Sequence, residues 1–411
     1  MTIRVIFLDL NSYFASVEQA EHPELMGRPV AVVPSLVDTT CCLAASYPAK
    51  ACGVRTGTLV KDARKLCPNI QFIEANHEKY VSYHHRIIEA VERCLPVTKV
   101  CSIDEMSFEL VGREQTLDFA LSKARSMKER IRVDVHPALT CSIGIAPNRY
   151  IAKMASDMQK PDGLTVIQSH ELPSRLFGLK LRDFPGIGPR MEERLVAARC
   201  NSAASLCQRS FEELTKLWGT KVGGDFWKLI HGEQIPERDS PRASFSHSRV
   251  LAPVDRTPEK AWPHLVALVT KAAMRLRYDR FYAKSMQLSI KLLSNERQSH
   301  SSTLHSNTWH RGCRFFETQD TNMLLAELSK LWKEAPRSRL LRVGITLGGL
   351  VVAEKHQLSI FENAKQANLM AAIDNLNKKI RKNLVVLGSS ADLKEGRHAP
   401  IAFGHIPNEF E

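Results

Sequence analysis

The order of strand and helix patterns in the first part of the chain constrains its fold more than any other feature. The apolar run at 3–9 predicts a buried strand, and the 3.6-residue spacing of 77–95 predicts a long amphipathic helix. A hairpin at 97–111, a helix at 116–133 and a strand at 138–145 follow. This succession is the split βαββαβ order of a ferredoxin-like sheet, with an insertion after the first strand.

Composition marks further regions along the 411 residues, a length that predicts several domains. Residues 169–235 show only short helical patterns around the glycine turn in FPGIGPRMEERL. The polar stretch at 236–245 contains two prolines and predicts a linker. A second α/β region follows at 246–352, and the remaining 353–411 predict only partial structure.

Three carboxylates stand where the βαββαβ fold would bring them together. Asp9 ends the first apolar strand, and Asp104 and Glu105 are adjacent among core residues in CSIDEMSFEL. An adjacent acidic pair is ordinarily a solvated turn, and neighbours in a regular strand point to opposite faces. In this strand order the first strand lies beside the hairpin, so a bend at the hairpin end would let all three side chains converge.

Converging carboxylates raise one another's pKa, and a divalent cation removes that conflict. Mg²⁺ prefers hard oxygen ligands, typically a few carboxylates together with substrate phosphates. Two such ions can activate a 3′-hydroxyl and stabilise a leaving pyrophosphate. The sequence therefore predicts phosphoryl transfer on a nucleotide.

Basic and phenolic groups suited to a triphosphate are also present. Tyr47 and Lys50 are one helical turn apart in SYPAKACGVRTG, and Lys160 directly precedes a proline–glycine helix stop. Each of these residues alone would more often be an ordinary surface residue.

Positive charge is concentrated in one quarter of the chain. Residues 246–350 hold 17 Lys and Arg against 8 Asp and Glu, which gives +9 of the net charge of +13. Such a segment favours a polyanionic partner, nucleic acid first and an acidic membrane surface second. A solvated charged face is the equally simple alternative.

The ten cysteines include no CxxC pair, which disfavours a zinc site or a disulfide framework and favours reduced thiols in the cytoplasm. No apolar run is long enough for a membrane-spanning helix, and the N-terminus does not have the pattern of a signal peptide. We therefore expect no membrane partner.

Four motifs in order, DLNSYFASVE, SYPAKACGVRTG, SIDE and DMQKPDG, resemble the Y-family (translesion) DNA polymerases. The resemblance covers residues 1–350 and implies a right-hand polymerase with a ferredoxin-like βαββαβ palm. It assigns the palm to 1–12 and 79–168, the fingers to 13–78, the helix-hairpin-helix thumb to 169–235 and the α/β little finger to 246–352.

The resemblance also implies roles for single residues. Asp9, Asp104 and Glu105, assisted by the Leu10 carbonyl, would hold two Mg²⁺ ions, for which Mn²⁺ can substitute. The incoming deoxynucleoside triphosphate would contact Tyr47, Lys50 and Lys160. Phe14 matches the steric gate that packs on the deoxyribose, while Tyr13 would face the core.

Contacts with primer–template DNA are implied for the thumb and the little finger. Gly186 and Gly188 would present backbone N–H groups to a phosphate, although a glycine turn between helices needs no DNA. In the little finger, clustering singles out Arg275, Arg277, Arg280 and Lys284 as candidate backbone contacts.

A short apolar motif follows the basic region. Gln357, Leu358, Ile360 and Phe361 resemble the QLxLF sliding-clamp peptide of bacterial polymerases, with Ile360 in place of the second leucine. Such a peptide would fill a hydrophobic groove with few anchors. One more strand of the little finger, or the start of a following helix, is the alternative.

The main hypothesis is a template-directed DNA polymerase that copies past damaged bases. An inactive homologue that binds DNA and scaffolds lesion bypass is the rival, disfavoured because all three carboxylates are retained. A nucleotidyl cyclase is disfavoured by the thumb motif and the basic region. DLN and Lys50 resemble the polymerase V catalytic subunit, which works with accessory subunits, whereas Tyr47 and DMQKPDG resemble polymerase IV.

Overall fold

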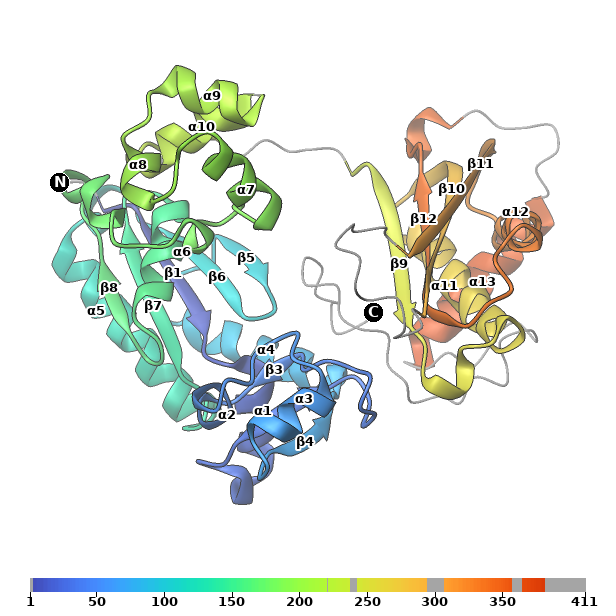
Figure 1. The fold of residues 1–411 in the computed structure, drawn as a ribbon, viewed down its shortest axis with the longest axis horizontal. Coiled ribbons are helices and arrows are strands. Elements are labelled where there is room, and N and C mark those ends of the chain that lie inside the picture. Colours follow the sequence, from blue (N-terminus) through green and yellow to red (C-terminus); the bar gives the residue numbers. More distant parts are fainter. Residues whose placement is uncertain (1–2, 220, 237–241, 294–306, 357–363, 381–411) are drawn as a thin grey trace. The chain divides into compact units, whose positions relative to one another are not determined.

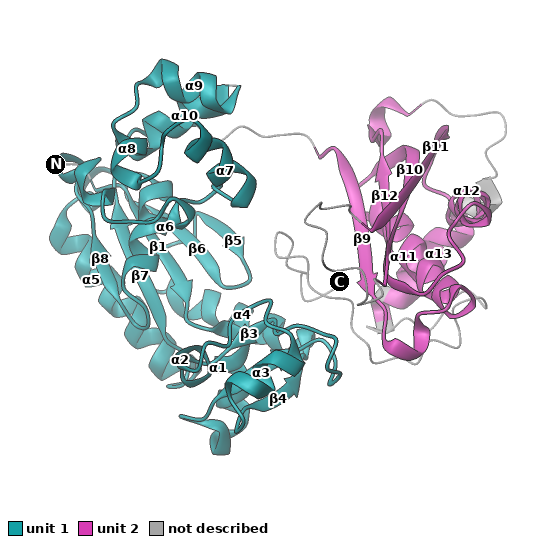
Figure 2. Cartoon of the chain, viewed as in Figure 1, with its two compact units in different colours: residues 1–238, 401–409 teal, residues 239–400, 410–411 magenta. Residues whose placement is uncertain are grey.

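The chain forms two compact units (Figures 1 and 2). The computed structural model describes residues 3–219, 221–236, 242–293, 307–356 and 364–380. The boundary between the units falls between residues 238 and 239, inside the predicted linker. Strand β9 (Ser244–Val250) begins earlier than expected, so the last two residues assigned to the linker belong to the second unit.

A five-stranded sheet in the order β5-β6-β1-β7-β8 is the centre of the first unit (Figure 1). Its strands are β1 (Val5–Leu10), β5 (Lys99–Ser102), β6 (Glu105–Glu109), β7 (Cys141–Ala146) and β8 (Leu164–Val166). The helices that cover its two faces are α4 (His77–Glu92) and α5 (Leu117–Arg130) on one side and α6 (Arg149–Met158) on the other. A π-helical turn (Ile131–Val135) extends α5. The predicted βαββαβ order is confirmed, and β8 extends it by one strand.

Alternation along β1 places Asp9 on the face that α6 covers. Val5 and Phe7 pack in the core formed with α6. The alternate residues Ile6, Leu8 and Leu10 pack in the core formed with α4 and α5. Because side chains two apart share a face, Asp9 projects toward α6. Its neighbours across the sheet are Glu105 of β6 and Ser142 of β7. The buried carboxylate thus follows from strand periodicity.

Helix α6 lies unusually close to β7 because β7 contains a glycine. A Cβ atom on Gly144 would lie 1.9 Å from the Ala152 carbonyl oxygen and 2.6 Å from the Ser156 nitrogen. No side chain fits in that space. Gly144 therefore fixes how near the polar residues of α6 come to the end of β1.

A smaller sheet, in the order β3-β2-β4, lies within residues 13–78, the region predicted to be the fingers. Its elements are β2 (Val30–Val33), β3 (Ala44–Ala45), β4 (Gln71–Glu74), α1 (Tyr13–Glu21), α2 (Tyr47–Ala51) and α3 (Val60–Leu66). Strand β4 pairs in parallel with β2. The sequence did not indicate it, because the strand is short and its two end residues are exposed.

The region predicted to be the thumb, 169–235, contains the helices α7 (Pro189–Ala197), α8 (Ala203–Cys207), α9 (Phe211–Trp218) and α10 (Lys221–Ile230). The turn before α7 requires glycine, since Gly186 has a φ of +92°, in the left-handed region. Gly188 then caps α7, and Pro189 begins it. The turn and the helix match the predicted helix-hairpin-helix entry.

The second unit is a sheet in the order β11-β10-β12-β9, with the short β13 (Val351–Val352) paired to β10. The main strands besides β9 are β10 (Phe281–Leu292), β11 (Thr308–Thr318) and β12 (Leu340–Gly348). Helices α11 (Pro258–Tyr278) and α12 (Thr321–Lys333) cover one face, and α13 (Ala364–Ile380) lies in the predicted tail. None of the helices described is both long and apolar enough to cross a membrane.

Candidate active site

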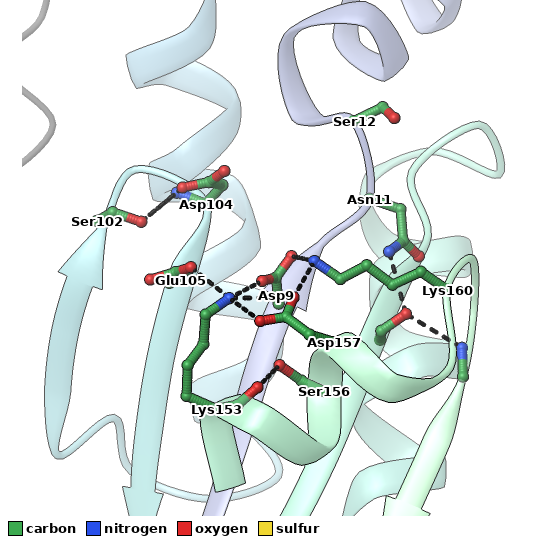
Figure 3. Close-up of polar contacts among 12 residues, drawn as sticks. Asp9, Asn11, Ser12, Ser102, Asp104, Glu105, Lys153, Ser156, Asp157 and Lys160 are labelled. Carbon is green, nitrogen blue, oxygen red and sulfur yellow. Dashed lines mark hydrogen bonds and ion pairs between the residues drawn. The ribbon is translucent and has the colours of Figure 1, made fainter. Parts of the chain in front are cut away.

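The three predicted carboxylates lie at one end of the central sheet (Figure 3). Asp9 is 4% exposed near the end of β1, and Glu105 begins β6 directly opposite it. Asp104 occupies the turn between β5 and β6, and its carbonyl accepts a 2.8 Å hydrogen bond from the Leu10 N–H. The bend at the hairpin end that the sequence required is present.

Asp104 turns away from the other two carboxylates. Its Oδ1 accepts a hydrogen bond of 2.5 Å from the Ser102 hydroxyl (Figure 3). Burial raises the pKa of the Asp104 carboxyl, and the charge of Asp9 adds to this effect, while the Ser102 hydrogen bond opposes it. The hydrogen bond from Ser102 and the repulsion between the two negative charges both favour an orientation of Asp104 away from Asp9.

Lys153 of α6 joins Asp9 to Glu105, and the sequence analysis missed it. Its Nζ lies 2.5 Å from Asp9 Oδ2, 2.7 Å from Glu105 Oε1 and 3.1 Å from Asp157 Oδ2 (Figure 3). Only the four-residue spacing of Lys153 and Asp157 on a helix is visible in the sequence. That spacing does not reveal which strand the helix faces.

The pKa shifts follow from this pairing. Burial alone would lower the pKa of Lys153, but the charges of Asp9, Asp157 and Glu105 together raise it above its ordinary value. Burial raises the pKa of Glu105 against the opposing effect of Lys153. The lysine is therefore a firmly held cation among acidic groups.

Lys160 approaches the same site from the loop after α6. Its Nζ lies 2.7 Å from Asp9 Oδ1 and 2.8 Å from Asp157 Oδ1. The loop is tied to β1 by Asn11, whose Oδ1 accepts a 2.8 Å hydrogen bond from the Asp162 N–H. Asn11, the last residue of the DLN motif, thus positions the loop that carries Lys160.

Tyr47 and Lys50 share one face of α2, as predicted. The Lys50 ammonium lies 4.5 Å from the centre of the Tyr47 ring and donates a 2.7 Å hydrogen bond to the Ser12 hydroxyl. Burial and the neighbouring charge of Lys160 lower the pKa of Lys50. The buried Tyr47 hydroxyl makes no hydrogen bond of ordinary geometry within the described part of the chain. It is available to an incoming acceptor.

Phe14 and Tyr13 begin α1 and are both buried. The Phe14 ring stacks on Tyr80, with 4.3 Å between ring centres. Tyr13 donates a 2.6 Å hydrogen bond to the Tyr80 carbonyl. The two rings therefore rest on the same residue of α4, which fixes their orientation.

The chemistry of these donors fits a divalent cation. Asp9 and Glu105 present hard oxygens to the ammonium of Lys153, which they share, and Asp9 also contacts Lys160. Asp104 adds a third carboxylate on the adjoining turn. Within the residues described, no group of three or more His, Cys, Asp and Glu side chains is arranged to hold one ion, since Asp104 bonds to Ser102 instead.

Of the four residues in the predicted basic cluster of the second unit, two are largely covered and two are exposed. Arg277 is an internal residue: its guanidinium binds both carboxylate oxygens of Asp374 in α13, at 2.6 and 3.0 Å. Arg275 is also largely covered and lies 3.8 Å from Asp279. Arg280 and Lys284 are more exposed and pair with Glu354 and Glu317. Two of the four residues thus lack the exposure that a phosphate contact needs.

The sheet face opposite α11 and α12 has a composition that the sequence analysis did not notice. It carries small and hydroxylated residues: Ser246, Ser248, Ser285, Ser289, Gly312, Gly344, Thr346 and Gly348. The exposed Arg314 and Arg342 stand on the same face, and neither forms an ion pair with another described residue. This signal lies in strand register, which the sequence alone does not give for β9 and β11.

The predicted clamp-binding residues Gln357, Leu358, Ile360 and Phe361 lie outside the described residues. His356, directly before them, is described and packs on the second unit. Its ring stacks on Tyr282 at 3.6 Å between centres, and its Nδ1 lies 2.8 Å from a Glu317 oxygen.

Comparison with known proteins covers most of the chain. Residues 8–157 match the impB/mucB/samB family, and residues 242–360 match the C-terminal domain of that family. DNA polymerase IV of Moorella thermoacetica is 32% identical over 388 residues, which cover 93% of this chain and 94% of the relative. DNA polymerase IV of Pelotomaculum thermopropionicum is 29% identical over 399 residues, covering 94% and 95%.

Solved structures share the fold. A Y-family DNA polymerase chimera of Dbh and Dpo4 has a TM-score of 0.68 at 22% identity, and covers 85% of this chain and 99% of its own. An insertion ternary complex of Dbh DNA polymerase has a TM-score of 0.54 at 22% identity, with coverage of 85% and 99%. The resemblance and the fold class predicted from the four motifs are confirmed.

Proposed function

Because the chain belongs to the impB/mucB/samB family, the Y family of DNA polymerases, we propose that Asp9, Asp104 and Glu105 hold the cations with which it extends a primer. The chain is a template-directed DNA polymerase of translesion synthesis. The observation that supports the site is the pairing of Asp9 and Glu105 around one positive charge.

Primer extension with Mg²⁺ and deoxynucleoside triphosphates tests this function. A protein that bound the duplex but never extended the primer would be the inactive homologue instead. Two Mg²⁺ ions, or Mn²⁺ in their place, would activate the primer hydroxyl and neutralise the leaving pyrophosphate. Asp9, Glu105 and Asp104 would be their ligands, together with the Leu10 carbonyl.

The basic residues beside the carboxylates suit the triphosphate. The ammonium group of Lys160 forms an ion pair with Asp9. A polyphosphate would offer this ammonium group a stronger partner. Lys50 and Tyr47 lie together on α2, and the Tyr47 hydroxyl has a donor to offer. These three residues would hold and orient the nucleotide, and the buried ring of Phe14 would pack on its sugar.

We also propose that the open sheet face of the second unit, the little finger, contacts the DNA backbone. Serine, threonine and glycine let a phosphodiester chain approach closely, and Arg314 and Arg342 supply charge without competing ion pairs among the residues described. Gly186 and Gly188 of the thumb, with the exposed Arg280 and Lys284, remain further candidates. We do not propose Arg275 and Arg277, because both are largely covered.

Replacing Arg314 with Gln should weaken primer–template binding and lower the slope of log affinity against log salt by about one unit. Fluorescence anisotropy at several KCl concentrations measures both quantities. Arg277→Gln is the matched control, because it removes the same charge from an internal ion pair. An equal loss of slope in both variants would contradict the assignment of the open face.

The segment with Gln357, Leu358, Ile360 and Phe361 is our proposed site for the bacterial sliding clamp. A weakly processive polymerase gains effective concentration at the primer end from such a tether. Accessory subunits of the polymerase V type stay a prediction from the DLN motif and Lys50. Because the proposed partners are DNA and the clamp, we place the activity in the cytoplasm.

The double variant Leu358→Ala/Phe361→Ala should retain single-nucleotide insertion and lose the clamp's stimulation of long products, since two of the three apolar anchors are removed. Product lengths with and without the clamp measure this. Leu369→Ala/Leu376→Ala, which alters two exposed leucines of α13, should keep the stimulation. If the clamp stimulated the Leu358→Ala/Phe361→Ala variant as much as the unchanged protein, the motif would have a structural role and would not bind the clamp.

A further inference from the structure

One ammonium group serves three carboxylates at the end of β1. Lys153 Nζ lies 2.5 Å from Asp9, 2.7 Å from Glu105 and 3.1 Å from Asp157 (Figure 3). The first two carboxylates are the proposed metal ligands. The ammonium of Lys153 therefore contacts two of the carboxylates that a metal cation would need.

Burial makes this pairing strong. The side chains of Asp9, Lys153 and Glu105 are only 6%, 21% and 26% exposed. Two carboxylates so far from water repel each other unless a positive charge lies between them. Lys153 supplies that charge to both carboxylates, and Lys160 supplies a second one to Asp9 alone.

The backbone of α6 keeps Lys153 in place. Gly144 allows α6 to lie against β7, and a Cβ there would collide with Ala152, the residue before the lysine. The side chain then runs along Phe7, with Nζ 5.5 Å from the ring centre. The reach of Lys153 to Asp9 is thus set by the core of the sheet.

We propose that Lys153 is a positioning residue: it is the resident counter-cation of Asp9 and Glu105, and a divalent cation must displace its ammonium from them. This inference rests on the proposed metal site.

Asp157 gives the displaced ammonium a second partner. It lies one helical turn beyond Lys153, already contacts it, and is 42% exposed. Lys153 can therefore leave Asp9 and Glu105 without losing all its charged partners. Until a metal arrives, Lys153 holds the two ligands in place, and metal binding is weakened by the strength of the pairing that must be given up.

The test is Mn²⁺ binding to the full chain without nucleotide or DNA, measured from the electron paramagnetic resonance signal of unbound Mn²⁺. Lys153→Met removes the competing charge and should tighten Mn²⁺ binding by about tenfold or more. Lys153→Arg keeps the charge and should stay within about threefold of the unchanged protein. Lys79→Met is the matched control, because Lys79 is as exposed as Lys153, at 21%, and forms an ion pair with the buried Glu18 of α1.

Thermal unfolding gives a second readout. In EDTA, Lys153→Met should unfold at a lower temperature than the unchanged protein. Mn²⁺ should raise the Tm of this variant by more than it raises the Tm of the unchanged protein. If the methionine variant fails to fold, Lys153→Gln, which keeps a donor but no charge, should show the same tighter binding.

The outcomes separate this inference from the proposed site. If Asp9→Asn abolishes Mn²⁺ binding but Lys153→Met binds as the unchanged protein does, or more weakly, the role of Lys153 is wrong and the metal site stands. If Mn²⁺ binding does not depend on Asp9, the metal site itself is wrong and the role of Lys153 fails with it.

Discussion

Glu105→Gln is expected to slow nucleotide incorporation by about 10³-fold or more, while affinity for primer–template DNA stays within about twofold. Glutamine has nearly the same shape and can still accept a hydrogen bond from Lys153, so the fold should survive. It lacks the charge that a metal ligand needs, and stabilisation of the transferred phosphoryl group is worth several kcal/mol. Asp104→Asn should have a comparable effect for the same reason.

Single-nucleotide primer extension under rapid-quench conditions measures the rate, and anisotropy measures DNA affinity. Glu109→Gln is the matched control, since Glu109 is an exposed glutamate on the same strand and the same face, four residues away. It should leave both quantities unchanged. Extension by Glu105→Gln at a rate near that of the unchanged protein would remove Glu105 from the ligand set.

Phe14→Leu is expected to reduce discrimination against ribonucleotides by roughly 10²-fold. The ring is held against Tyr80, and the rigid stack would leave no room for a 2′-hydroxyl beside it. Leucine frees part of that space and, unlike alanine, retains much of the apolar volume in a buried position. The selectivity should therefore change more than the stability.

The ratio of kcat/KM for dCTP and CTP opposite a template guanine measures this selectivity. Tyr13→Leu is the matched control: it removes the neighbouring ring and its hydroxyl, which donates a hydrogen bond to the Tyr80 carbonyl. That variant should lower the Tm and leave sugar selection unchanged. Equal loss of selectivity in the two variants would mean that α1 had shifted as a whole and that Phe14 is not the gate.

The periodicity of the sequence predicted much of the fold of the first unit. The apolar run of β1 and the helical period of 77–95 are local properties, so they can be recognised without knowledge of the tertiary structure. The sequence analysis did not predict β4, a short edge strand, or β11, a longer edge strand with polar residues on its open face. Neither strand has a strong local pattern. Their pairing depends on a partner strand far away in the sequence.

The residues of the site divide in the same way. Asp9, Asp104, Glu105, Tyr47, Lys50 and Lys160 stand in ordered motifs, and the sequence alone marked them as candidates. It also marked Arg277, which looked like any exposed arginine at a helix end. In the fold, α13 supplies Asp374 as its charged partner, and the Gln319 carbonyl and the Thr321 hydroxyl accept further hydrogen bonds from it.

The sequence by itself determined that Asp9 shares a face of β1 with Val5 and Phe7, because side-chain alternation in a strand needs no tertiary contact. The tertiary structure alone decided what faces Asp9. The approach of α6 to β7 over Gly144 brings Lys153 to Asp9 and Glu105, and the turn after β5 directs Asp104 to Ser102. These contacts join residues up to 144 positions apart, and their geometry depends on how a helix packs on a sheet, which no local period specifies.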